Sequence, residues 1–200
     1  MKRILSIILL LTAAACDNLN MKHGRDFDRS YDAWKEFKKS SGYSYSYTVT
    51  AGTGAGASWN TDLVIIKGQI TERRFTYTAF HDIRRPAGGW DEESRNKILA
   101  GMKLTAAEFE ERSGKKLSEV MEWTETGANL GKNVNTSAAE LRTLDQVYEI
   151  ARTELLIKRK DAQVYFEAKN SGMISSAGYV PDNCQDDCFH GVNISEIKRL

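Results

Sequence analysis

The chain has 200 residues, of which 41% are hydrophobic and 28% are charged, a composition typical of a soluble globular protein. Its 28 basic residues nearly balance its 27 acidic ones, and they form no basic stripe of the kind that binds nucleic acid. A chain of this length supports one domain that buries roughly 70% of the surface exposed by its unfolded form. These values exclude a nucleic-acid-binding protein and give no reason to expect a second domain.

The N-terminal segment "MKRILSIILLLTAAAC" has the charged, apolar and small-residue order of a secretory signal. Its apolar run, residues 4–15, is well short of the roughly 20 residues that cross a bilayer as a helix. The next residue, Cys16, resembles the modified cysteine in the lipobox of bacterial lipoproteins. This resemblance implies that residues 1–15 are a lipoprotein signal peptide and that Cys16 carries diacylglycerol. The alternative is an ordinary signal peptide followed by an incidental cysteine.

Residues 16–27 are polar and are expected to form a tether between the membrane and a domain of residues 28–200. The domain should open with a helix, because Tyr31, Trp34 and Phe37 recur at threefold spacing. The tether would then hold the folded domain clear of the lipid surface.

The next stretch, "GYSYSYTVTA", alternates strictly, with Tyr43, Tyr45 and Tyr47 on one face, which predicts a half-buried strand. A hairpin is expected in "TDLVIIKGQITERRFTYTAF", with its turn at Lys67 and Gly68. The loop between these two stretches contains three glycines. No helix follows that loop to offer its amides and dipole to a phosphate group, so the sequence does not favour a nucleotide site.

Residues 81–140 give a weaker signal and are expected to be an elaboration of the domain. A capping-box pattern precedes one short helix, and "LSEVMEWTETG" fits either a strand or a helix. The clearest helix follows, with Ser137 and Glu140 as its expected capping box. Its apolar stripe, which should pack on the tyrosine-bearing sheet above Val164 and Phe166, consists of Leu141, Leu144, Val147, Tyr148, Ala151 and Leu155.

Three more strands are expected near the C-terminus, in "AQVYFEA", "MISSAGYV" and "GVNISEI". Strands joined by short turns, together with a few amphipathic helices, predict a single α+β domain. Its antiparallel β-sheet should carry helices packed on one face.

The order "TLDQVYEIA" followed by "VYFEAKNSGMISSAGYVPDNCQDDCFHGVNISEI" resembles a group of uncharacterised bacterial lipoproteins that carry a DUF6174-like domain. The resemblance covers residues 31–80 and 141–197. It implies localisation in the cell envelope and the fold described above. The family has no established activity, so the resemblance supplies no catalytic residue.

A catalytic site is not favoured by the residues themselves. His81 beside Asp82 has the composition of a general-base pair, yet a solvated turn explains it better. Glu122 and Glu125 flank a tryptophan, as paired carboxylates do in sugar hydrolysis, but a polar face is the favoured interpretation. The remaining histidine outside the C-terminal loop, His23, falls in the expected tether.

The C-terminal loop "DNCQDDCFHG" admits four interpretations: zinc, a redox pair, calcium or a disulfide. A disulfide between Cys184 and Cys188 is favoured, because a tight turn brings residues four apart within bonding range. The bond would display the side chains of a candidate binding rim. These are Asp182, Asp186, Asp187 and His190.

The sequence therefore predicts a lipid-anchored bacterial cell-envelope lipoprotein, most simply a binding or interaction domain for an unknown protein or small ligand. It has no expected cofactor beyond the lipid on Cys16. The alternatives are an envelope hydrolase with an unrecognised site and a calcium-binding module. Loop tryptophans are either core fillers or interface anchors, and this distinction should be tested at Trp59, Trp90 and Trp123.

Overall fold

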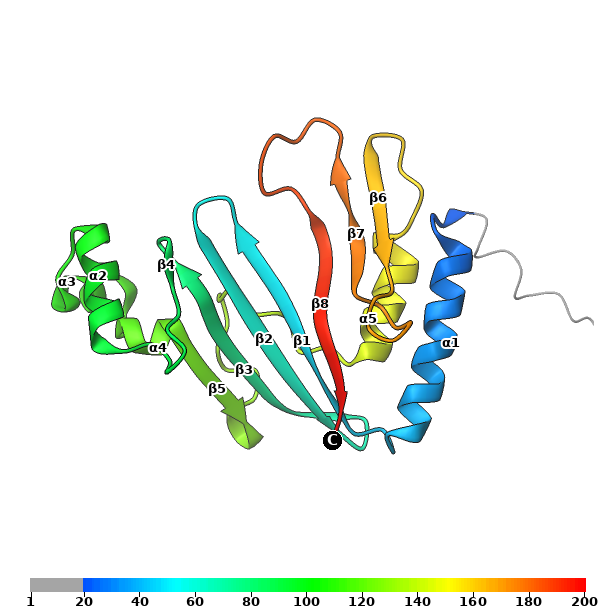
Figure 1. Cartoon of the computed structure of the whole chain (residues 1–200), viewed down its shortest axis with the longest axis horizontal. Helices are drawn as coiled ribbons and strands as arrows, with labels where there is room; N and C mark the ends of the chain where they lie inside the picture. Colours follow the sequence, from blue (N-terminus) through cyan, green and yellow to red (C-terminus); the bar gives the residue numbers. More distant parts are fainter. Residues whose placement is uncertain (1–19) are drawn as a thin grey trace, which may run out of the picture.

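The computed structural model describes residues 20–200, so Cys16 and the expected signal peptide lie outside the described residues. Its centre is an eight-stranded antiparallel sheet in the order β4-β3-β2-β1-β8-β7-β6, with β5 paired to β3 (Figure 1). The strands are β1 (Tyr45–Thr53), β2 (Ala57–Ile66), β3 (Gln69–Phe80), β4 (Ile83–Arg84), β5 (Glu122–Thr126), β6 (Ala162–Glu167), β7 (Ser176–Pro181) and β8 (His190–Arg199).

Helices occupy two places around this sheet. The first and last α-helices lie beside the β8-β7-β6 half, and the others lie at the opposite edge, beside β4 and β5 (Figure 1). The helices are α1 (Gly24–Ser40), α2 (Glu92–Met102), α3 (Ala106–Ser113), α4 (Leu117–Met121) and α5 (Leu144–Ile150), with a 3₁₀ turn η2 (Gly127–Asn129) and a π-helix η3 (Ala151–Leu155). The predicted fold class, a single α+β domain with an antiparallel sheet, is confirmed.

The main core lies between the sheet and the α1/α5 pair. The Trp34 ring of α1 meets the rings of both Tyr45 and Tyr148, at centroid distances of 5.0 and 6.3 Å. Residues of the predicted stripe, Leu144 and Ala151 among them, are fully buried here. Leu141, Leu155 and Phe166 pack against the same cluster. The predicted helix-on-sheet packing is therefore confirmed.

A second, smaller core accounts for the helices at the other edge of the sheet. It gathers residues of α2, α3 and α4 around the end of β3, within the segment that the sequence marks as an elaboration. Its buried members are Trp90, Ile98, Leu99, Phe109, Leu117 and Met121. The ambiguous stretch "LSEVMEWTETG" holds both structures, since α4 runs directly into β5.

The expected hairpin is confirmed at the β2–β3 turn. Lys67 and Gly68 both have positive φ, at 50° and 81°. This is the backbone geometry of a type I′ turn, which suits the right-handed twist of the two strands it joins. β2 and β3 pair along nearly their whole length.

The expected boundary between the tether and the folded domain is wrong. The tether does not extend to residue 27, because α1 starts at Gly24 and Phe27 is only 3% exposed. Met21 is also buried, and the ring Nε2 of His23 lies 3.0 Å from the carbonyl oxygen of Val164. Folded structure therefore begins several residues earlier than the polar composition indicates.

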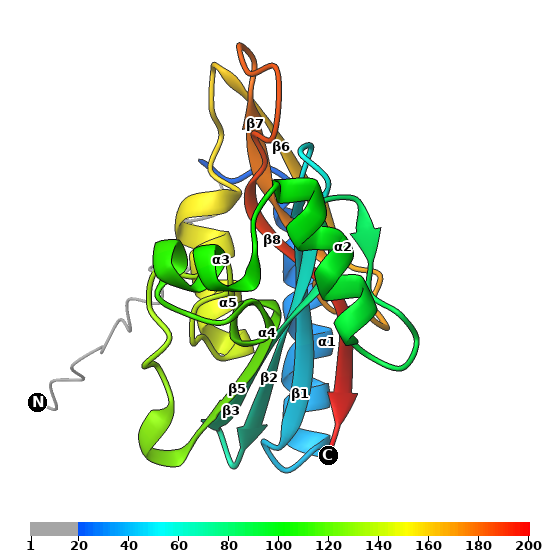
Figure 2. The ribbon, with the colours of Figure 1, turned by 90° about the vertical axis from the view of Figure 1, so that its left-hand side faces the viewer.

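The long C-terminal helix also begins later than expected. Ser137 and Glu140 do not cap it; instead Thr143 accepts from the Gln146 amide, and the Gln146 side chain accepts from the Thr143 amide. The sequence contains two capping-box patterns in succession, and the second one is used. Residues 130–143, which follow η2, instead cross the sheet as an irregular segment on the same side as α5 (Figure 2).

Candidate functional site

The sheet is split between its two central strands. β1 pairs with β8 only as far as Val49 and Ile194. Beyond this pair β1 continues with β2 while β8 continues with β7, and the two strands diverge in Figure 1. At the open end, the Gly54 amide donates to both carboxylate oxygens of Asp187, at 2.7 and 2.8 Å. The split is therefore closed by a paired strand at one end and a loop contact at the other.

A cavity of about 290 Å³ lies against this split, between the sheet and the end of α5. Its apolar wall includes Tyr47 and Val49 of β1, Val147 and Ile150 of α5, and Val192 of β8. Charged and titratable side chains complete the lining. These are Glu140, Arg142, Glu154, Arg159 and His190. A concavity in which polar groups converge beside an apolar wall can hold a small molecule, and polar groups make up much of this lining.

Three of the lining residues form a stack. The guanidinium carbon of Arg159 lies 3.8 Å from the centre of the Tyr179 ring, and the His190 ring stacks on the same tyrosine at 5.1 Å. Tyr179 and His190 are directly paired across β7 and β8. Because a flat guanidinium on an aromatic face is held in one orientation, the edge of Arg159 is presented in a fixed direction.

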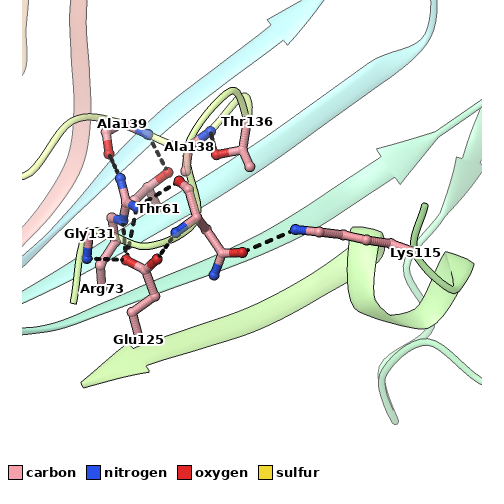
Figure 3. Close-up of polar contacts among 9 residues, drawn as sticks. Thr61, Arg73, Lys115, Glu125, Gly131, Thr136, Ala138 and Ala139 are labelled. Carbon is pink, nitrogen blue, oxygen red and sulfur yellow. Dashed lines mark hydrogen bonds and ion pairs between the residues drawn. The ribbon is translucent and has the colours of Figure 1, made fainter. Parts of the chain in front are cut away.

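The wall formed by residues 139–142 is held in place from the sheet. Thr61 accepts from the Ala139 amide at 2.9 Å, and Arg73 Nη1 donates to the Ala139 carbonyl at 3.1 Å (Figure 3). The hydroxyl of Tyr47 donates to the Arg142 carbonyl at 2.5 Å. Burial raises the pKa of Tyr47, so its hydroxyl remains a neutral donor.

Arg73 is in turn fixed by a buried ion pair with Glu125. Its Nε and Nη2 donate to one carboxylate oxygen of Glu125 at 3.0 and 2.8 Å (Figure 3). The Glu125 carboxylate also accepts from the amides of Gly131 and Asn133. Burial alone would raise the pKa of Glu125, but these amides and the Arg73 guanidinium outweigh it and hold the pKa below its ordinary value.

This network corrects the expectation that Glu122 and Glu125 both lie on a polar face. Glu122 is exposed, whereas only 2% of the Glu125 side chain is exposed. The Glu125 carboxylate accepts from Arg73 and from two backbone amides of the protein itself, which is the arrangement of a structural ion pair rather than of a catalytic acid. Its effect on the cavity is indirect, through the segment that Arg73 anchors.

The predicted disulfide between Cys184 and Cys188 is present, with the two Cα atoms 6.0 Å apart. Of the expected rim residues it brings one, His190, to the cavity. Asp187 bonds to Gly54, and Asp186 lies close to the same glycine. The amide of Asp182 donates to the carbonyl of Asp161. The four residues therefore do not converge on one point.

Other sequence-based candidates are dispersed. His81 and Asp82 occupy the exposed β3–β4 turn with positive φ, as expected of a solvated turn. Trp90 fills the second core and donates its Nε1 to the Tyr77 carbonyl at 2.9 Å. Trp59 and Trp123 are half-buried. The Trp59 ring packs edge-on against Tyr77, and the Trp123 ring stacks on Phe75. The three tryptophans form no common exposed patch.

No group of three or more His, Cys, Asp or Glu side chains in residues 20–200 is arranged to hold a metal ion. No helix within the same range is long and apolar enough to cross a membrane.

Sequence reasoning did not identify the cavity itself. Its lining comes from three stretches far apart in the chain: residues 47–49, 139–159 and 179–192. One local signal was available, because "LIKRKDAQVYF" places Arg159 directly before a strand, but its stacking partner Tyr179 lies on another strand.

A scan against protein-family models, a search of curated proteins and a search of solved structures each found no match to this chain.

Proposed function

We propose that the protein is a lipid-anchored binding domain of the bacterial cell envelope, and that it binds a small ligand in the cavity between α5 and the split sheet. The observation that carries the proposal is the cavity itself, with its apolar wall and its fixed charged edge. Its volume of about 290 Å³ lies near the lower end of the range for small-molecule sites, which suits a compact ligand better than a polymer.

Two features of the surrounding structure support this proposal. The wall at residues 139–142 is anchored by hydrogen bonds to Thr61, Arg73 and Tyr47, so the site is preorganised. The π-helix η3 also contributes to the lining, through Glu154 and Leu155. A π-turn of this kind frequently occurs at functional sites.

Filling the cavity should abolish ligand binding without unfolding the domain. We expect the neutral fluorescent probe N-phenyl-1-naphthylamine to bind the full-length chain carrying Cys16→Ser, and Val192→Trp to weaken that binding at least tenfold. The reason is that Val192 lines the cavity and is half-buried. Fluorescence titration measures the affinity, and thermal melting followed by circular dichroism checks the fold.

The matched control is Val180→Trp. Val180 lies on the neighbouring strand β7, is also half-buried and does not line the cavity. It should keep the affinity of the parent chain. Equal probe binding by a folded Val192→Trp variant would contradict the proposed site.

The proposed localisation makes a separate prediction. Cys16→Ser should abolish membrane association, because the lipid on that cysteine would supply the anchor and two or more acyl chains are needed for stable attachment. Fractionation of cells and the mass of the mature N-terminus measure this. A variant that is uncleaved and still sediments with membranes would show that the lipoprotein interpretation is wrong.

A further inference from the structure

We infer that the ligand of this cavity carries a single carboxylate or phosphate group on a short apolar body, and that Arg159 binds this anionic group. The inference rests on the proposed function and specifies the chemistry of the ligand. Its basis is the state of the Arg159 side chain, which differs from that of the other arginine in the cavity.

Arg159 retains unused hydrogen-bonding capacity. Its Nη2 donates to the carbonyl oxygen of Glu154 at 2.7 Å, but its Nε is buried and has no hydrogen-bond partner within the described residues. A buried donor left without a partner costs free energy. Because Nε is buried, an incoming acceptor would reach the guanidinium at Nη1, which makes no hydrogen bond within the described residues.

Arg159 also lacks a direct ion-pair partner among the described residues, although Glu154 lines the same cavity. Arg142, the other arginine of the lining, pairs with Glu140 at 2.5 Å. A guanidinium binds carboxylate and phosphate oxygens through two parallel N–H groups. The stack on Tyr179 fixes the plane of the Arg159 guanidinium, and its Nη1 remains for such a contact.

The remaining lining defines the rest of the ligand. The apolar wall of Tyr47, Val49, Val147, Ile150 and Val192 suits an alkyl or aromatic body. The cavity volume of about 290 Å³ is too small for the two chains of a membrane phospholipid, so the expected source is a free, single-chain or aromatic acid.

The test is competition for the neutral naphthylamine probe on the full-length Cys16→Ser chain at pH 7. Decanoate and monodecyl phosphate supply the anion, and 1-decanol supplies the same body without charge. We expect Arg159→Gln to lower the affinity for either anion, relative to that for decanol, at least tenfold. Probe and decanol affinities should be unchanged, which shows that the cavity remains formed.

Arg152→Gln is the matched control, since Arg152 lies on η3, pairs with Glu149 on the surface and does not line the cavity. It should leave the ratio of affinities unchanged. If decanol and the anions compete equally well in both the parent and Arg159→Gln, the inference is overturned while the proposed binding site stands. If the probe does not bind the parent chain at all, the proposed site and the inference both fail.

Discussion

Replacing Glu125 with glutamine should destabilise the domain by about 3–5 kcal/mol, the usual effect of removing one partner from a buried ion pair. The variant leaves the Arg73 charge buried, with only 7% of its side chain exposed. It also replaces a carboxylate that accepts from the amides of Gly131 and Asn133 with a group that carries two donors. Urea denaturation of parent and variant measures the loss.

The effect should depend on pH in a defined direction. The pKa of Glu125 is held below its ordinary value, so its contribution to the free energy of unfolding is complete above about pH 4.3, the ordinary value for a glutamic acid. The contribution is lost as the pH falls through the lower pKa of the folded state. The difference in stability between parent and variant should therefore narrow in acid.

Glu122→Gln is the control for this experiment, because it makes the same change three residues away on the same strand. Glu122 is 43% exposed and pairs with a partly exposed Arg85, so its loss should cost less than about 1 kcal/mol. Hydrogen exchange adds a local measurement: Glu125→Gln should expose the amides of residues 131–139, which the ion pair anchors. Equal losses for the two variants would contradict a structural role for the buried pair.

The buried pair also shows where sequence reasoning reaches its limit. The sequence left the segment around Glu122 and Glu125 open between strand and helix and favoured a polar face for both, whereas β5 exposes Glu122 and buries Glu125. Burial of Glu125 depends on Arg73, which lies 52 residues away and faces it across β3 and β5. No local pattern reports a partner at that distance.

Local signals succeeded where the deciding interactions are local. The turn at Lys67 and Gly68 needs positive φ at both residues. The alternation of Tyr45 and Tyr47 in β1 needs only a covered face, whereas Tyr43 lies before the strand and is 49% exposed. The sequence predicts too early a start for the helix that contains α5, because Ser137 and Thr143 each begin a capping-box pattern. The choice between them is made by the contacts of Ala139 to Thr61 and Arg73, which draw residues 137–142 onto the sheet.

The predicted start of α1 is wrong for a related reason. Residues 21–27 contain only two apolar side chains, Met21 and Phe27, among polar ones, so composition indicated a tether. Both side chains are buried against elements near the C-terminus, as Phe27 shows by its contacts with Tyr148 and Phe166. The disulfide was predictable because both cysteines lie in one short loop, but the cavity beside it combines residues from three distant stretches.

Leu144→Ala should lower the free energy of unfolding by about 2–5 kcal/mol, the range for removing a buried leucine side chain from a packed core. Leu144 is fully buried at the first turn of α5, against the Tyr45 and Tyr47 face of the sheet. The substitution leaves the backbone hydrogen bond at this position unchanged, since the N–H of Leu144 donates to the Tyr45 hydroxyl at 3.0 Å. The loss should therefore report side-chain packing between helix and sheet.

Ile66→Ala provides the comparison, because Ile66 ends β2, is 40% exposed and lies outside the core. Its cost should stay below about 1 kcal/mol, as for most surface substitutions. Chemical denaturation of both variants, analysed with a common slope, gives the two losses. A Leu144→Ala loss under about 0.5 kcal/mol would be that of a surface residue and would contradict the packing of α5 on the sheet. Since α5 and η3 form one side of the cavity, the same result would also remove the structural basis for placing a ligand there.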